Sequence, residues 1–423
     1  MHLIDVRVTE SGVYPDFRRV EARIALQSTG RVFSFGFDFP ADLEPDLTDN
    51  GNAWVLLMLP LASYYGEDIQ IDRPVDGLFL ENLLGVQRLW KSWYPELHVV
   101  DIKPAAILPR AASDRPGKVI ACFSGGVDSL FTFNRHRDRL LGNGHGLIDE
   151  LLCIGGLMTS MADIGTLRQD FERVAGETGH RLIPIVMDFR YGAKDGPNPY
   201  TVGFGEWWEK LTHGVAIATP VHLFDKRYKE LLIPASIDIS TIAPWGSHPL
   251  SDPLLSSSGL SIVHDGIIFS RFERTAAIAK IEDALQILHV CGQDRRLGNC
   301  SRCEKCLRTM TSLDLLGARA RAKTFDWSDF SLRTISRIWL GENAYRAESK
   351  AIEWDIIQRE ASALGRQDVV EAIASMLRYS RAKRRTLWIV KSNPLSATAW
   401  AVIRSLRDAL RKRQARPAAL SPG

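Results

Sequence analysis

The chain has 423 residues, of which 45% are hydrophobic and 24% charged, a composition typical of a globular protein. This length exceeds that of one hydrophobic core, so we expect two or three domains. The net charge of +3 hides an asymmetry, because residues 378–416 carry a net charge of +11 and the remainder about −8. No apolar run approaches the roughly eighteen residues of a membrane-spanning helix. The amino terminus also lacks the basic and apolar regions of a secretory signal.

Residues 1–112 are expected to form a separate α+β N-terminal domain. Three segments alternate apolar and polar residues as half-buried strands do, and two further segments have helical periodicity. The strands are expected at 3–8, 20–26 and 32–39, and the helices at 53–65 and 78–93. No motif assigns this domain a chemistry. A structural or oligomerisation role is favoured over substrate or partner binding, and we expect a homo-oligomer.

A segment rich in proline, arginine and alanine at 109–117 is typical of a linker. After it, apolar strands alternate with amphipathic helices, which favours a parallel sheet with helices on both faces. Strands are expected at 119–123, 151–154, 182–187, 231–237 and 260–263, and helices at 130–135, 163–177, 207–223 and after Arg271. The predicted fold class is therefore α/β, with a doubly wound central domain at 117–315. Ligands of such sheets bind beyond the carboxyl ends of the strands.

One motif follows the first of these strands and opens a helix. It consists of Ser124, Gly125, Gly126, Val127, Asp128 and Ser129. Such a strand-to-helix turn directs backbone N–H groups at one point, and its glycines let a phosphate oxygen approach the main chain. The serine hydroxyls add donors, and Asp128 could hold the magnesium ion that accompanies a nucleotide. The spacing differs from that of the Walker loop, which is absent from the chain.

Four of the six cysteines lie within sixteen residues, at Cys291, Cys300, Cys303 and Cys306. The spacing C-x8-C-x2-C-x2-C is typical of tetrahedral sulfur coordination, which favours a structural zinc ion. An iron–sulfur cluster is the alternative, although it usually has a Cys-Pro pair that is absent after Cys306. This arrangement does not resemble a secreted disulfide framework, so a reducing cytoplasm is the expected location.

The motif at 124–129 resembles the SGGxDS loop of the PP-loop ATP pyrophosphatase superfamily. Together with the four cysteines it is similar to 7-cyano-7-deazaguanine synthase of queuosine biosynthesis, over residues 117–315. The resemblance implies an adenine nucleotide alpha hydrolase-like fold that binds ATP and magnesium at 124–129 and zinc at the cysteines. It also implies a carbon–nitrogen ligase that adenylates a small carboxylate, such as a 7-deazaguanine, and releases pyrophosphate and AMP.

The flanking regions depart from the typical, shorter synthase and leave the acceptor open. No amide-hydrolysing domain accompanies the loop, so ammonia or an amine is expected from outside. Longer relatives are associated with bacterial antiviral operons in which a deazaguanine is joined to a protein amine. A protein acceptor or an operon partner is therefore among the expected partners. Two alternatives stay open: a PP-loop enzyme that thiolates a nucleobase or tRNA, and a non-catalytic nucleotide-binding subunit of a larger complex.

Further polar residues near predicted strand ends are candidates for substrate or magnesium binding. They are Asp188, His248, His264, Asp265 and Arg274. The last of them stands where the resemblance places a basic residue that opens a helix near the substrate.

Residues 323–423 are expected to be helical and to end in the basic tail. A basic amphipathic helix can bind nucleic acid or a membrane surface. We favour a docked terminal helix, because the apolar residues from Trp400 to Leu410 form a stripe at helical spacing.

Overall fold

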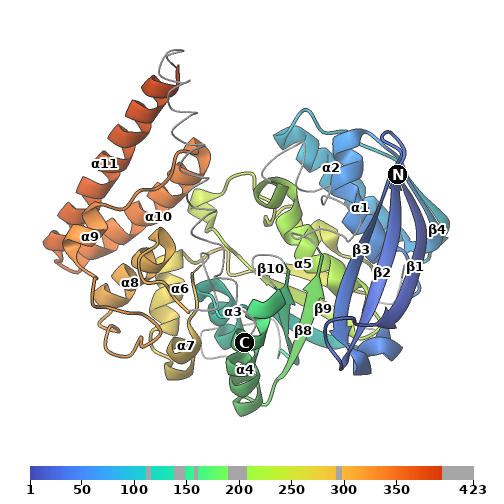
Figure 1. The fold of residues 1–423 in the computed structure, drawn as a ribbon, viewed down its shortest axis with the longest axis horizontal. Coiled ribbons are helices and arrows are strands. Elements are labelled where there is room, and N and C mark those ends of the chain that lie inside the picture. Colours follow the sequence, from blue (N-terminus) through green and yellow to red (C-terminus); the bar gives the residue numbers. More distant parts are fainter. Residues whose placement is uncertain (111–115, 138–147, 157–160, 189–206, 292–297, 393–423) are drawn as a thin grey trace, which may run out of the picture. The chain divides into compact units, whose positions relative to one another are not determined.

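The computed structural model describes residues 1–110, 116–137, 148–156, 161–188, 207–291 and 298–392 (Figure 1). The chain divides into two compact units, residues 1–327 and residues 328–423. No helix in the described part of the chain is long and apolar enough to cross a membrane.

The described strands of the first unit form one mixed sheet of ten strands, in the order β10-β9-β6-β7-β8-β3-β2-β1-β4-β5. The five from β10 to β8 are parallel, and β3, β2 and β1 follow antiparallel. The strands are β1 (His2–Glu10), β2 (Phe17–Leu26), β3 (Arg31–Pro40), β4 (Ile69–Asp76), β5 (Ile102–Leu108), β6 (Lys118–Cys122), β7 (Glu150–Gly155), β8 (Arg181–Met187), β9 (Tyr228–Pro234) and β10 (Ser261–Asp265). The predicted α/β class is confirmed.

The helices expected in the first unit are present, with one irregularity, and α7 and α8 were not predicted from the sequence. The helix expected at 207–223 begins as a π-turn, Trp208–Thr212, before continuing as α5. The α-helices are α1 (Asn52–Tyr65), α2 (Gly77–Trp93), α3 (Val127–Arg137), α4 (Met161–Glu177), α5 (His213–His222), α6 (Arg271–Ile278), α7 (Glu282–Ile287) and α8 (Glu304–Leu315). Short 3-10 turns lie at Ala41–Asp46, Ile239–Thr241 and Asp252–Leu255.

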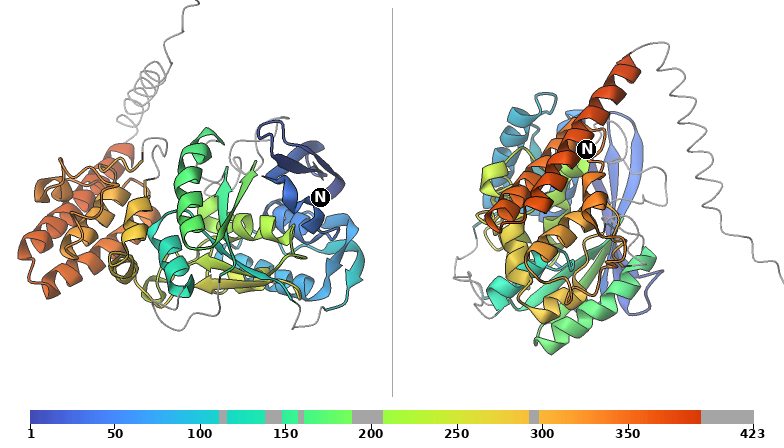
Figure 2. Two further views of the ribbon diagram at one scale, coloured as in Figure 1. Left: turned by 90° about the horizontal axis from the view of Figure 1, so that it is seen from below. Right: turned by 90° about the vertical axis from the view of Figure 1, so that its left-hand side faces the viewer.

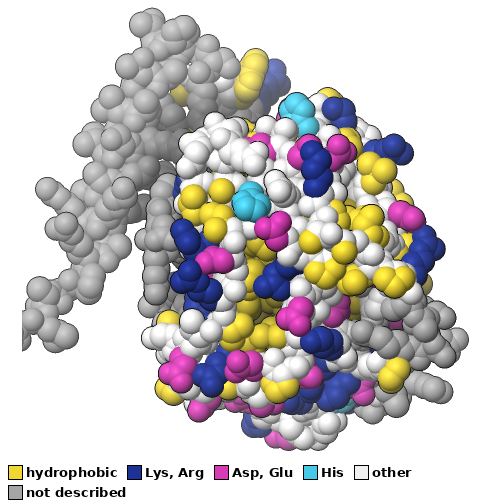
Figure 3. All heavy atoms as spheres, turned by 90° about the vertical axis from the view of Figure 1, so that its right-hand side faces the viewer, with side chains coloured by type: hydrophobic (Ala, Val, Ile, Leu, Met, Phe, Trp, Pro, Cys, Tyr) yellow, Lys and Arg dark blue, Asp and Glu magenta, His cyan; other side chains and the backbone are white. Residues whose placement is uncertain are grey.

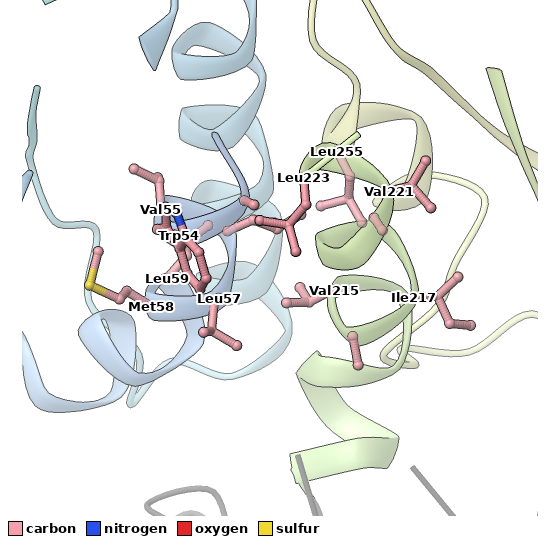
Figure 4. Close-up of a cluster of buried hydrophobic side chains, with 14 of the residues drawn as sticks. Trp54, Val55, Leu57, Met58, Leu59, Val215, Ile217, Val221, Leu223 and Leu255 are labelled. Atoms are coloured by element: carbon pink, nitrogen blue, oxygen red, sulfur yellow. The ribbon is translucent and has the colours of Figure 1, made fainter. Parts of the chain in front are cut away.

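Helices α1 and α5 pack against each other through buried side chains, although 147 residues lie between them in the sequence. Figure 4 shows Leu57 of α1 and Val215 of α5 pointing toward one another. Trp54 of α1 is 2% exposed and lies 6.0 Å, between ring centroids, from Phe37 of β3. The amino-terminal segment therefore packs against α5, the helix between β8 and β9.

The segment expected as a separate N-terminal domain continues the central sheet. Phe37 of β3 pairs antiparallel with Met187 of β8, and Arg19 of β2 forms an ion pair with Asp188 at the end of β8. The linker pattern at 109–117 therefore separates two parts of one compact unit, with residues 111–115 outside the described residues. The boundary between the two compact units lies after Trp327, a few residues beyond the boundary expected at 315–323.

Two strands, β4 and β5, were not predicted from the sequence. Strand β4 carries consecutive charged residues and a proline, and β5 contains Pro104. Such residues weaken the alternating pattern of a strand, but proline is tolerated in an edge strand, which β5 is.

The surface of the first unit beside β1 and β4 carries both charges. Figure 3 shows Lys and Arg side chains interspersed with Asp and Glu on this face. Arg18 of β2, for example, lies 3.2 Å from Glu10 and 2.9 Å from Glu44. Positive charge is therefore accompanied by negative charge here, unlike the net basic segment 378–416.

The second unit contains three described helices, α9 (Leu332–Ser336), α10 (Ala344–Ala363) and α11 (Gln367–Ser392). Figure 2 shows α10 and α11 side by side, and Trp354 and Ile373 are fully buried. Ser380 of α11 donates to the carbonyl of Ile338, 3.0 Å away. The predicted helical region is thus present, whereas the stripe from Trp400 to Leu410 lies outside the described residues.

One buried carboxylate joins three central strands at their amino ends. Glu150 of β7 accepts hydrogen bonds from Arg227 and Tyr228 at 3.0 and 2.7 Å and also binds Lys118. Burial raises the pKa of Glu150, but the hydrogen bonds from Arg227, Lys118 and Tyr228 outweigh it and lower this pKa to about 2. The pairing therefore stabilises the fold above pH 4.5, and this contribution is lost as the pH falls toward 2.

We predict that Glu150→Gln lowers the free energy of unfolding at pH 7 by about 3 kcal/mol. The variant should also lose part of the pH dependence of stability between pH 5 and pH 2. Chemical denaturation across this range measures both effects. Glu10→Gln, at a side chain that is 87% exposed, is the control. Equal pH profiles for wild type and Glu150→Gln would contradict the assignment.

Candidate nucleotide and metal sites

The loop at 124–129 joins the carboxyl end of β6 to the first turn of α3. The N–H of Phe123 donates to the carbonyl of Leu152 at 2.7 Å, which anchors the start of the loop on β7. The hydroxyl of Ser129 lies 3.2 Å from that of Ser124 and donates to the carbonyl of Gly126 at 3.1 Å. The second half of the loop is the first turn of α3, so the loop contains a helix N-terminus, a place where anions can bind.

Gly125 has a backbone conformation and a packing environment that exclude a side chain. Its φ is +68°, in the left-handed region. A Cβ atom at this position would lie 2.7 Å from the ring of Phe171. At Gly126, by contrast, the nearest atom to a Cβ would be the Ser124 hydroxyl oxygen at 3.4 Å, an ordinary contact.

The loop opens into a cavity of about 230 Å³ at the carboxyl ends of β6, β7 and β9. One part of its lining is polar and the other apolar or aromatic. The polar residues are Ser124, Asp128, Ser129, Ser236 and Lys305, and the others are Cys122, Phe123, Leu152, Ile154, Trp208, His213, Ile217 and Pro234. The predicted position of a ligand site, beyond the strand ends, therefore coincides with a cavity.

Asp128 accepts two ion pairs. Arg271 lies 3.0 Å from one carboxylate oxygen and Arg274 lies 2.9 Å from the other. Burial raises the pKa of Asp128, but the charges of Arg271 and Arg274 outweigh this effect, so its pKa lies below the usual value. The carboxylate is ionised near neutral pH, and a magnesium ion at this position would share it with two guanidinium groups.

Arg274 is 1% exposed and is bonded to protein acceptors. Besides Asp128, it donates to the carbonyls of Ile237 and Phe269, at 2.9 and 2.8 Å, and to that of Ala235. A contact of Arg274 with substrate would require these bonds to break. Its place in the structure is that of a positioning residue.

The other candidates from strand ends also have protein partners. Asp188 binds Arg19 and accepts from the N–H of Gly36 at 3.0 Å. Asp265 accepts from Thr132 at 2.7 Å and from Arg135 at 2.9 Å. Neither lies among the described residues that line the cavity.

The two candidate histidines lie close to a buried carboxylate. The ring of His248 packs against Trp93 at 4.8 Å between ring centroids, and the backbone N–H of His248 donates to Asp252 at 3.1 Å. Nδ1 of His264 lies 2.7 Å from a carboxylate oxygen of Asp252. Neither histidine belongs to the described lining of the cavity, so both are placed as parts of the supporting structure.

A third histidine, His213, was missed as a site residue. Burial lowers the pKa of His213 to about 4, so the imidazole is neutral at pH 7. The indole N–H of Trp245 donates to its Nδ1 at 3.3 Å, and the Trp208 ring lies 4.3 Å away. A neutral imidazole that accepts at Nδ1 carries its hydrogen on Nε2 and offers a donor. In the sequence, His213 is a lone histidine within a helix, and no local pattern distinguishes it.

The four predicted cysteines come together at one point. Their sulfur atoms all lie within 4.8 Å of one another, with Cys291 to Cys303 at 4.0 Å and Cys300 to Cys306 at 3.9 Å. These separations are too long for a disulfide. Zinc–sulfur bonds of about 2.3 Å in a tetrahedron place sulfur atoms about 3.8 Å apart. The cluster could therefore hold a metal ion such as zinc.

The backbone around the cysteines is held by local hydrogen bonds. The side-chain oxygen of Asn299 accepts from the N–H of Val290 at 2.9 Å, and its amide donates to the carbonyl of Leu288 at 2.8 Å. Ser301 has a positive φ of 57° and accepts from the N–H of Asp326 at 2.8 Å. The sulfur arrangement therefore rests on a structured turn, while residues 292–297 lie outside the described residues.

Comparisons of the chain with protein-family models, with curated proteins and with solved structures find no match.

We predict that Cys303→Ser removes a metal ligand and lowers the free energy of unfolding by several kcal/mol, because the binding energy of a structural metal is largely folding energy. Elemental analysis and thermal melting of the purified protein measure the two effects. Cys153→Ser, at a cysteine outside the cluster, is the control. One equivalent of metal and unchanged melting in Cys303→Ser would contradict the four-cysteine site.

Gly125→Ala should destabilise the protein by about 1–2 kcal/mol from its left-handed backbone alone, with an added cost from the contact with Phe171. Gly126→Ala is the matched control, and we expect its effect to be below about 1 kcal/mol because no close contact results. Urea denaturation of both variants measures the difference. Equal stability of the two variants would show that the loop adopts another conformation.

Proposed function

We propose that this chain is an ATP-dependent carbon–nitrogen ligase of the PP-loop ATP pyrophosphatase superfamily, similar to 7-cyano-7-deazaguanine synthase. The observation that carries the proposal is the loop at 124–129, which lies at the carboxyl end of β6 and opens into the cavity. The four-cysteine cluster beyond it, with the spacing of that synthase, supports the same assignment.

The two parts of the cavity suit the two parts of ATP. The serine hydroxyls of the loop and the N-terminus of α3 would bind the β- and γ-phosphates with magnesium. The apolar part, with Trp208 and Ile154, has the chemistry of a site for a planar purine-like ring.

The superfamily's doubly wound sheet is covered on both faces, and consecutive residues of a strand point to opposite faces. The contacts of two neighbouring residues of β10 support such a sheet here, because His264 bonds to Asp252 whereas Asp265 bonds to Thr132 of α3.

The proposed reaction has two steps. A carboxylate oxygen of the substrate attacks the α-phosphorus of ATP, and the bond to the departing pyrophosphate breaks. The nitrogen of ammonia, or of an amine on a protein, then attacks the acyl carbon and displaces AMP. Four cysteine ligands leave no open position on a zinc ion, so the metal would act on the structure and not on the substrate.

A thiolating enzyme is the main alternative, and the cysteine in the cavity lining makes it less favoured. Sulfur transfer by a cysteine requires an accessible thiol of low pKa. Cys122 lines the cavity, but burial raises its pKa far above the usual value. Cys122 therefore stays protonated near neutral pH and is a poor nucleophile.

The proposal predicts that the purified protein converts ATP to AMP and pyrophosphate only when a carboxylate such as that of a 7-deazaguanine is present. Product analysis by chromatography with isotopically labelled ATP makes this measurement. The Gly125→Ala variant should lose the reaction, which separates it from a contaminating activity. Release of ADP would contradict adenylation, and normal ATP binding without pyrophosphate release under any acceptor would favour a non-catalytic subunit.

A further inference from the structure

Lys305 connects the cysteine cluster to the cavity. In the sequence it stands between Cys303 and Cys306, and α8 begins one residue before it. Cys303 is the N-cap residue of α8 and Cys306 lies in its first turn. A metal ion that binds both sulfur atoms would fix the geometry of this turn, and with it the direction in which Lys305 leaves the helix.

The side chain of Lys305 belongs to the lining of the cavity, together with the loop residues Ser124, Asp128 and Ser129. Its charge also acts on other lining residues. It contributes to the lowered pKa values of Asp128 and His213, which lie on α3 and α5. Lys305 is thus an exposed residue at the cavity, close enough to Asp128 and His213 for its charge to act on both.

Among the described residues of the lining, Lys305 is the one cationic side chain. His213 is neutral near pH 7, and Arg271 and Arg274 are paired with Asp128. A triphosphate brings about four negative charges into a cavity that already contains the Asp128 carboxylate. Positive charge from the protein would offset part of this charge in addition to magnesium, and Lys305 is placed in the lining to do so.

A second link joins the metal cluster to the loop. The N–H of His289, two residues before Cys291, donates to the carbonyl of Gly125 at 2.7 Å. The residues just before the cysteine cluster are thus bonded to the loop, and Lys305, within the cluster's turn, lines the cavity.

We propose that Lys305 binds the pyrophosphate part of a nucleoside triphosphate, and that the metal ion of the cysteine cluster positions Lys305 for this contact. This inference deepens the proposed function and rests on it. The metal centre then has a role in ligand binding as well as in folding, although no ligand touches the metal. The lysine stabilises the charge of the pyrophosphate in the bound and departing states.

Affinities for ATP, AMP and inorganic pyrophosphate test the role of Lys305. Lys305→Met should weaken binding of ATP and of pyrophosphate tenfold or more, about the effect of one charge-assisted hydrogen bond, and leave AMP binding unchanged. Arg302→Met is the matched control, because Arg302 lies in the same turn and outside the described lining of the cavity. Isothermal titration calorimetry measures all three ligands.

Unchanged ATP and pyrophosphate affinity in Lys305→Met, or an equal loss for AMP, would overturn the role of Lys305 while leaving the proposed function standing. If the wild type binds pyrophosphate through Lys305 but not ATP, the proposed function fails and the lysine site stands. A wild type that binds neither would overturn both.

The positioning by the metal is tested by Cys300→His and Cys300→Ser. The first keeps four ligands and should keep both zinc and pyrophosphate affinity. The second should lose zinc and weaken pyrophosphate binding to the level of Lys305→Met, with AMP binding retained. The double variant Cys300→Ser with Lys305→Met should show no further loss. Additive losses, or full pyrophosphate affinity in a zinc-free protein, would overturn the link to the metal.

Discussion

The ion pair between Arg274 and Asp128 is the interaction on which the candidate site depends. Arg274 is almost fully buried, and a buried guanidinium needs a counter-charge and hydrogen-bond acceptors. The Asp128 carboxylate neutralises the charge, and the carbonyls of Ile237 and Phe269 accept hydrogens of the second terminal nitrogen. One side chain thereby ties the first turn of α3 to the segments that follow β9 and β10. Removing Asp128 would leave the Arg274 charge buried without a counter-charge, whereas removing Arg274 would leave Asp128 paired with Arg271 alone.

The cysteine cluster is connected to the same region. The four thiols lie close enough together to hold a metal ion, and metal binding would supply folding energy to this short turn. The backbone bond from His289 to Gly125 joins the segment before the cluster to the loop, and Lys305 of the cysteine turn lines the cavity. The two motifs, about 160 residues apart in the sequence, therefore form one connected region of the structure.

The amino-terminal segment contributes to this region at a distance. Its strand β3 extends the sheet beside β8, and Arg19 and Asp188 bond across the junction. Its helix α1 packs on α5, and α5 presents His213 and Ile217 to the cavity (Figure 4). The segment thus packs behind one wall of the cavity and shares a compact unit with the central strands.

The sequence by itself determined the α/β class, the central strands and helices, the loop at 124–129 and the clustering of the four cysteines. These features are encoded in patterns a few residues long, such as apolar runs, glycine turns and C-x2-C spacing, and such patterns act locally. Only the tertiary structure decided that β3 joins β8, that Arg274 binds Asp128, and that His213 and Lys305 line one cavity. Each of these depends on partners that are distant in the sequence: Arg274 and Asp128 are 146 residues apart. Asp128 and Arg274 were candidates by their local motifs, but nothing in the sequence paired them, and His213 and Lys305 look like ordinary helix residues until the sheet brings the strand ends together.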